Sequence, residues 1–193
     1  MLPIYQAGKD VQLGMEDGVY RSNSTQDKSL IGLQYDKYFM TQTVSDAFMV
    51  FYNKVAERLM NAAPARDAKI GFLAYANMTI PPVQNIKAKA PLVAFLAPVD
   101  IDPIHHMEDP KGGPRREFKD MLYLRSEVMN GRVVIYDYDQ GMLVCRDVPN
   151  PSIQSIRYDI KQYEKAGILG VQTESRNAIG TTFLNLYIRG HLY

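Results

Sequence analysis

Five short apolar runs recur along the chain, and polar or turn residues follow each of them. The runs lie at residues 11–15, 70–75, 92–97, 132–136 and 168–173. Apolar runs of this length between turn residues are typical of strands that are buried on both faces, as in a parallel sheet. The pattern therefore predicts five parallel-type strands.

Most stretches between these runs carry apolar residues every three or four positions, which is the period of a helix with one buried face. The predicted helices cover residues 43–62, 115–129, 152–166 and the segment after residue 176. In the last helix we expect Ile179, Phe183, Leu186 and Tyr187 to face inward. Residues 19–42 are polar and have no sustained period, so we expect a long loop there.

Strands that alternate with helices indicate a parallel α/β sheet, and 193 residues suit one domain spanning residues 1–193. Two architectures fit: an open doubly wound sheet, and a piece of a (β/α)₈ barrel. A complete barrel typically has about 250 residues, so we expect the chain to hold only part of one, roughly the second half of a TIM-type barrel. Because a half-barrel leaves an open sheet edge, we expect a homo-oligomer or a missing barrel half as partner.

Composition excludes some classes of function. A net charge of +1 argues against a general nucleic-acid or membrane-surface binder. No apolar run has the length of a membrane span, and the first residues do not resemble a signal peptide, which leaves the compartment open. The single cysteine, Cys145, excludes an internal disulfide framework. The 13 tyrosines matter more, because tyrosine stacks on flat ligands such as sugar rings.

Polar side chains follow every predicted strand. They are Glu16 and Asp17; Tyr75 and Asn77; Asp100 and Asp102; Tyr136, Asp137, Tyr138 and Asp139; and Glu174 and Arg176. The carboxyl ends of parallel strands converge on one rim, where ligands of α/β proteins collect. Paired carboxylates with neighbouring phenols are the groups that hydrolyse glycosides. Any one acid could instead cap a helix or hold a loop, but recurrence at five strand ends favours a site.

Other chemistries have less support. Five side chains of the types that can bind a metal lie close together in sequence: Asp100, Asp102, His105, His106 and Asp109. Adjacent histidines on an extended chain point opposite ways and no His-x-x-x-His spacing is present, so we expect neither a metal nor a cofactor. Nucleotide-binding and serine-hydrolase motifs are absent. Arg176 could clamp a substrate carboxylate or pair with Glu174.

Several of these strand ends resemble those of a known family. The motifs are Glu16-Asp17-Gly18, the Ala74-Tyr75 strand end, Tyr136-Asp137-Tyr138, and Gly170-Val171-Gln172-Thr173-Glu174 followed by a final helix. They resemble the DUF4838 proteins, an uncharacterised bacterial family that is similar to the family 20 hexosaminidase and α-glucuronidase type of glycoside hydrolase barrel. The resemblance covers most of the chain from about residue 11 on.

The resemblance implies a (β/α)₈ barrel, of which this chain would hold roughly the fourth to the eighth strand. It places the general acid at Glu16 or Asp17, and the base or a substrate contact at Asp137 or Glu174. It is compatible with a secreted or periplasmic bacterial protein. The chain also departs from the family pattern, because Arg125 and Cys145 stand near positions where an aromatic residue, often Trp, is expected.

The leading hypothesis is a glycoside hydrolase-like barrel segment that acts on a carbohydrate ligand. Its candidate catalytic residues are Glu16, Asp17, Asp137 and Glu174, and its candidate substrate-binding residues are Tyr75, Asn77, Asp100, Asp102, Tyr136, Tyr138 and Arg176. The alternatives are a non-catalytic module that binds a glycan or a protein, and a self-associating half-barrel. Asp139 lies further into its loop and is the weakest of the acidic candidates.

Overall fold

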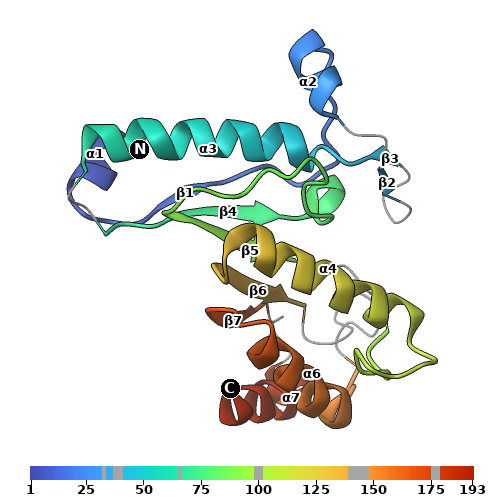
Figure 1. Ribbon diagram of the computed structural model, residues 1–193. Helices are drawn as coiled ribbons and strands as arrows, with labels where there is room; N and C mark the ends of the chain where they lie inside the picture. Colours follow the sequence, from blue (N-terminus) through green and yellow to red (C-terminus); the bar gives the residue numbers. More distant parts are fainter. Residues whose placement is uncertain (32–33, 37–40, 65–66, 98–101, 139–147, 175–178) are drawn as a thin grey trace.

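The computed structural model describes residues 1–31, 34–36, 41–64, 67–97, 102–138, 148–174 and 179–193. Within them, the main sheet has five strands, all parallel, in the order β1-β4-β5-β6-β7 (Figure 1). These strands are β1 (Val11–Leu13), β4 (Ile70–Ala74), β5 (Leu92–Leu96), β6 (Val133–Asp137) and β7 (Gly170–Thr173). The prediction of five parallel strands is confirmed.

Helices alternate with these strands. The long ones are α3 (Ser45–Ala62), α4 (Gly113–Met129), α6 (Ile153–Lys165) and α7 (Ile179–Leu192). Shorter elements are α1 (Leu2–Gln6), α2 (Thr25–Leu30), the antiparallel pair β2 (Tyr35–Asp36) and β3 (Thr41–Gln42), and the 3₁₀ helix η1 (Ala76–Met78). The segment predicted as a long loop, residues 19–42, therefore contains three of these short elements: α2, β2 and β3. The Ser24 side chain caps α2, because it accepts a hydrogen bond from the Asp27 backbone N–H.

The strands lie in the sheet in the same order as in the chain. A doubly wound sheet instead reverses its strand order at a switch point. Since β1, β4, β5, β6 and β7 show no such reversal, every connection moves the chain in one direction across the sheet. Of the two architectures that the sequence allowed, the structure is consistent with the partial (β/α) unit fold.

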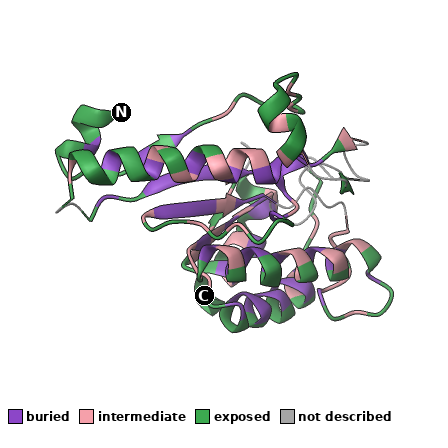
Figure 2. Cartoon of the chain, turned by 45° about the horizontal axis from the view of Figure 1, so that its top comes forward, coloured by how far each residue is buried: buried purple, intermediate pink, exposed green. Residues whose placement is uncertain are grey.

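One face of the sheet carries the hydrophobic core. Phe72 of β4 and Ile135 of β6 are buried in it, and the ring of Phe72 stacks on Tyr52 of α3 with 4.5 Å between centroids. Leu122 of α4 and Ile156 of α6 belong to the same cluster. Three successive long helices therefore pack on one face, as expected for (β/α) units wound in a single direction. Figure 2 shows the buried residues concentrated in the sheet and on the inner sides of these helices.

The opposite face of the sheet is less covered. Successive side chains of a strand point to opposite faces. On this second face, Leu73 and Phe95 are half-buried, whereas Gln12 and Gln172 are exposed. An all-parallel sheet usually has both faces covered, so this partly open face is the unusual feature of the fold.

Helix α7 packs differently from the prediction. Ile179, Phe183 and Tyr187 are exposed at 63%, 58% and 55%, whereas Asn185 and Arg189 are buried. The expected inward face was wrong because polar contacts orient the helix. The Asn185 side chain accepts from the Ser152 backbone N–H at 3.0 Å and donates to the Asn150 carbonyl at 2.8 Å. Arg189 forms a buried ion pair with Asp137 of β6. Hydrophobic periodicity cannot detect a helix that is anchored by its polar side.

Candidate functional site

A pocket of about 360 Å³ lies where β1, β4, β6 and β7 end. It is lined by Met15, Glu16, Asp17, Tyr20, Leu73, Tyr75, Met78, Tyr136, Tyr138 and Glu174. Six of the residues that the sequence predicted for the rim are therefore brought together: Glu16, Asp17, Tyr75, Tyr136, Tyr138 and Glu174. They are more than 150 positions apart in the chain at their extremes, and the parallel order of the strands is what gathers them.

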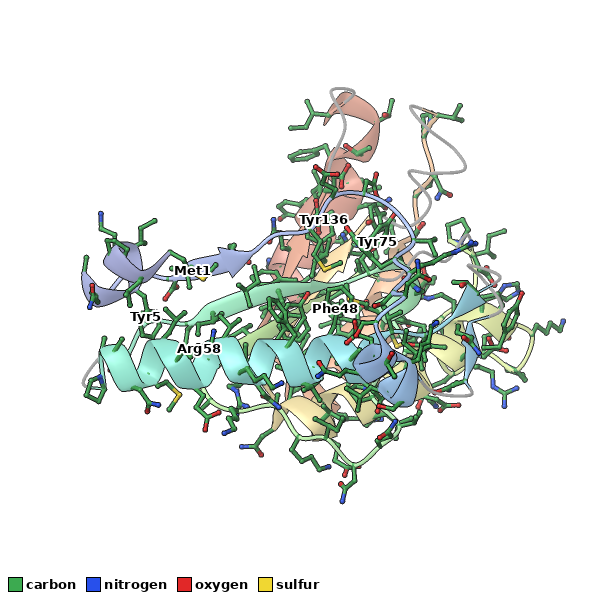
Figure 3. The ribbon with its side chains drawn as sticks, turned by 90° about the horizontal axis from the view of Figure 1, so that it is seen from above. Met1, Tyr5, Phe48, Arg58, Tyr75 and Tyr136 are labelled. Carbon is green, nitrogen blue, oxygen red and sulfur yellow. The ribbon has the colours of Figure 1, made fainter. Side chains whose placement is uncertain are left out.

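The alternation along β6 decides which of its polar residues reach the pocket. Val133, Ile135 and Asp137 are buried on the helix-covered face. Tyr136 and Tyr138 point to the opposite, open face, and their rings meet edge to face with 5.7 Å between centroids. Tyr75 reaches the same pocket from the end of β4, and Figure 3 shows Tyr75 and Tyr136 near one another at the strand ends.

Two carboxylates are hydrogen-bonded by these phenols. The Tyr136 hydroxyl donates to Glu174 Oε2 at 2.9 Å. Tyr75 is hydrogen-bonded to the Asp17 side chain. Asp17 follows β1 and Glu174 follows β7, which are the two outermost strands of the sheet. A flat five-stranded sheet would hold those strands roughly 19 Å apart. Because both carboxylates line one pocket, the chain beyond the strand ends and the curvature of the sheet must bring them together.

The electrostatics of the pocket reflect this convergence. Burial raises the pKa of Tyr75, and the hydrogen bond to Asp17 and the charges of Asp17 and Glu174 raise it further. Burial also raises the pKa of Tyr138, with contributions from Tyr75, Glu174, Tyr136 and Asp17. The pKa of Tyr136 is raised by burial and then by its hydrogen bond to Glu174. All three phenols consequently stay protonated near neutral pH and remain hydrogen-bond donors.

Comparison with known families now adds an independent finding. Residues 33–192 match the family described as a domain of unknown function, DUF4838. The chain belongs to the DUF4838 family. No curated protein and no solved structure matched the chain. The family predicted from the strand-end motifs is thereby confirmed, while the similarity to family 20 and α-glucuronidase barrels stays a prediction.

Asp137 does not line the pocket of this DUF4838 chain. Its Oδ2 lies 2.9 Å from Nη2 of Arg189 in α7, and both residues are at most 5% exposed. Its Oδ1 accepts a hydrogen bond from the backbone N–H of Tyr138, and Arg189 also donates to the Thr173 hydroxyl at 2.7 Å. The sequence placed Asp137 on the rim with its neighbours, but a strand turns alternate residues to opposite faces. The structure gives this carboxylate the geometry of a structural ion pair between β6 and α7.

Asn77 also lies beside the pocket and not in its lining. Its side-chain amide donates to the carbonyls of Tyr20 and Gln42, and its Oδ1 accepts from the Tyr20 backbone N–H. The two bonds with Tyr20 fix the segment that follows β1 against η1, and the bond to Gln42 attaches β3 there as well. Tyr20 also lines the pocket, although it was not among the residues predicted for the rim. In the sequence, Tyr20 is only an aromatic residue four positions after Glu16, in a segment without hydrophobic periodicity.

The remaining predicted contacts lie elsewhere. Asp102 accepts from the backbone N–H groups of Ile104 and His105 and lies 2.8 Å from His105 Nδ1, so it orders its own loop. Asp100 and Arg176, like Asp139 and Cys145, lie outside the described residues. Among the residues that the structure describes, no three His, Cys, Asp or Glu side chains are grouped to hold a metal ion.

Arg125, one of the two departures from the expected aromatic positions, is buried beneath the pocket-lining Met78. Its Nη2 donates to the backbone carbonyls of Met78, Thr79 and Ile80 at 2.7, 3.1 and 3.0 Å. Burial lowers the pKa of Arg125 to about 10, which still leaves it charged at neutral pH. The guanidinium therefore holds the turn after η1.

A larger hollow of about 550 Å³ lies between residues 80–87 and α4. It is lined mainly by apolar groups such as Pro82, Val83 and Met121, and none of the predicted site residues reaches it. We therefore take the strand-end pocket as the candidate site. In the described part of the chain, no helix has the length and apolar character needed to cross a membrane.

Proposed function

We propose that the strand-end pocket binds a sugar unit of a glycan and cleaves its glycosidic bond by carboxylate acid/base chemistry. One observation carries this proposal. Asp17 and Glu174, from opposite edges of a parallel sheet, line one pocket together with four tyrosines. The tyrosines offer flat faces for a sugar ring and hydroxyls for its hydroxyl groups. The two carboxylates offer the pair that glycoside hydrolysis requires.

In the proposed reaction, Asp17 in its acid form gives its proton to the glycosidic oxygen while the bond from that oxygen to the anomeric carbon breaks. The freed sugar chain leaves as an alcohol. In one route, ionised Glu174 bonds to the anomeric carbon, and water then displaces it while the Asp17 carboxylate takes the proton of that water. In the other route, Glu174 takes a proton from the water that adds directly to the anomeric carbon. The separation of the carboxyl groups distinguishes the routes, at about 5–5.5 Å for retention and about 6.5–9.5 Å for inversion.

The test is a panel of aryl glycosides assayed with the full chain, Asp17→Asn and Glu174→Gln. Both substitutions keep size and remove the acid function, so each should lower kcat/KM by about 10²–10⁴-fold. Glu164→Gln is the matched control, because Glu164 is an exposed carboxylate on α6 that does not line the pocket. Hydrolysis that both pocket substitutions leave unchanged would refute this assignment.

A second candidate function is glycan binding without cleavage. It is favoured by the hydrogen bonds between Tyr136 and Glu174 and between Tyr75 and Asp17. These bonds hold the polar groups in fixed positions, and such a surface can bind sugar hydroxyls without cleaving the glycan. Titration with oligosaccharides would then show saturable binding and no product. Tyr136→Ala should weaken that binding by about five- to 150-fold. This is the usual effect of removing an aromatic side chain that stacks on a flat ring, as measured for nucleic-acid bases.

The uncovered face and edges of the sheet suggest a partner. Among the described residues, β1 pairs only with β4 and β7 only with β6. Next to β7, helix α7 exposes Phe183 and Tyr187, whose rings stack with 5.9 Å between centroids. We propose that a further (β/α) segment, or a second copy of this chain, covers this region. If the partner is a second copy, light scattering of the chain should show concentration-dependent association, and a soluble monomer at all concentrations would contradict self-association.

A further inference from the structure

The charge of the pocket lining limits the sugars that it can accept. The described lining residues include three carboxylates, Glu16, Asp17 and Glu174, and no Lys, Arg or His. The buried arginines near the sheet are engaged elsewhere. Arg189 pairs with Asp137 on the helix-covered face, and Arg125 donates to backbone carbonyls below the pocket. A sugar that carries a carboxylate, sulfate or phosphate would therefore find no cationic side chain among these groups and would be repelled by the ionised carboxylates.

The aromatic residues of the lining add a second, independent preference. Tyr20, Tyr75, Tyr136 and Tyr138 reach one cavity from three separate chain segments. Aromatic faces attract ammonium groups through the negative face of the ring, and proteins recognise quaternary ammonium ligands with cages of several aromatic rings. The lining therefore matches a ligand that is both a ring and a cation.

Glu16 is the carboxylate that the proposed reaction leaves unused. Asp17 and Glu174 form the acid/base pair, so the third acid needs another role. Glu16, Asp17 and Tyr20 line the same pocket, and burial together with the charges of these two carboxylates raises the pKa of Tyr20. The same hydroxyl donates to the backbone carbonyl of Glu16. This corner of the pocket holds negative charge and an aromatic ring side by side.

We propose that the pocket is specific for glycans with an unacetylated amino sugar, whose ammonium group binds between Glu16 and Tyr20. The inference rests on the proposed function, because it names the substrate class of the same site. An N-acetylated sugar lacks the cation, and a uronic acid carries the opposite charge. The whole chain has a net charge of +1, so it has no general attraction for cations, and the preference belongs to the pocket.

Calorimetric titration of the full chain with three oligosaccharides of equal length tests the proposal. The probes are a fully deacetylated glucosamine tetramer, its N-acetylated counterpart and a galacturonic acid tetramer, at about pH 6, where the uronic acid probe is ionised and the amine probe is mostly protonated. An exposed ion pair and a cation–π contact together predict binding of the amine tetramer about fivefold to thirtyfold tighter than that of the acetylated one. The advantage should shrink at high salt.

The Glu16→Gln variant assigns the effect to one group. It should weaken binding of the amine tetramer about twofold to fivefold and leave the acetylated tetramer unchanged, whereas Glu164→Gln should change neither. Both glutamates are exposed, so folding should survive each change, and thermal melting would check this. Tyr20→Leu tests the aromatic contribution separately and should also reduce the preference for the amine.

The outcomes separate the two proposals. If the acetylated tetramer binds as tightly as the amine tetramer, or the galacturonic acid tetramer binds tightest, the amino-sugar inference is overturned while glycan binding stands. If none of the three tetramers binds, the proposed function fails, and the inference fails with it. A preference for the amine that both Glu16→Gln and Tyr20→Leu leave intact would also overturn the assignment to this corner.

Discussion

Replacing Asp137 by asparagine should destabilise the fold severely while leaving the pocket lining in place. The substitution keeps the size of the side chain and removes the charge that faces Arg189, 2.9 Å away. Arg189 is 5% exposed, so it cannot turn its guanidinium to water without breaking its contact with Thr173. Removing one partner of a buried ion pair typically costs about 3–5 kcal/mol, because the other charge stays buried and uncompensated.

Urea denaturation at neutral pH would measure this loss. A domain of this size is typically stable by about 5–15 kcal/mol, so a loss of 3–5 kcal/mol should move the midpoint strongly at an unchanged slope. Glu174→Gln is the contrasting variant, since Glu174 is exposed, and its stability should stay within about 0.5 kcal/mol of the parent chain.

The double variant Asp137→Asn/Arg189→Met sharpens the test. It removes both charges, so it should regain much of the stability that Asp137→Asn alone loses. A loss below about 1 kcal/mol for Asp137→Asn, or a double variant that is no more stable than the single one, would refute the assignment of Asp137 to a structural ion pair. Asp137 would then have to be reconsidered as a group that acts at the rim.

Two further predictions concern residues near the pocket. Arg125→Met removes the donor to three carbonyls after η1 and should cost about 2–4 kcal/mol in urea denaturation, whereas Arg125→Lys, which keeps a charged donor, should cost less. The second concerns Asp102: burial raises its pKa, but the hydrogen bonds and charge of His105 lower it more, to below the usual 3.8. Its contribution to stability is therefore present above that value and lost as the pH falls through the lower folded-state pKa, so Asp102→Asn should reduce the acid sensitivity of unfolding.

Much of the fold followed from local patterns. The five strands were predictable because each is an apolar run that is bounded by polar or turn residues and is shorter than most helices. Helix α6 was predictable for the same kind of reason, since Ile156, Ile160 and Tyr163 all lie on its buried side. The winding direction was not predictable, because the same alternation of strands and helices serves doubly wound sheets and barrels.

The candidate site was predictable only at the level of strand ends. Convergence of the rim follows from parallel order, which is why Asp17, Tyr136 and Glu174 were found together. Successive side chains of a strand point to opposite faces of the sheet, and the sequence does not show how far beyond the strand this alternation continues. For this reason Asp137 faces the helices, whereas its neighbours Tyr136 and Tyr138 face the pocket. Tyr20 reached the pocket through the contact of its backbone with Asn77, a link across 57 positions that sequence spacing cannot reveal.

The distance between the two proposed catalytic carboxylates depends on the curvature of the sheet. Asp17 and Glu174 follow the two edge strands, and a (β/α) segment that extends the sheet at β1 or β7 would change how far it curls. The retaining and the inverting distances differ by about 1–4.5 Å, which is less than the spacing of about 4.8 Å between neighbouring strands. A covering partner would therefore act on catalysis as well as on stability, by setting the separation of the two carboxyl groups across the open face that the tyrosines line.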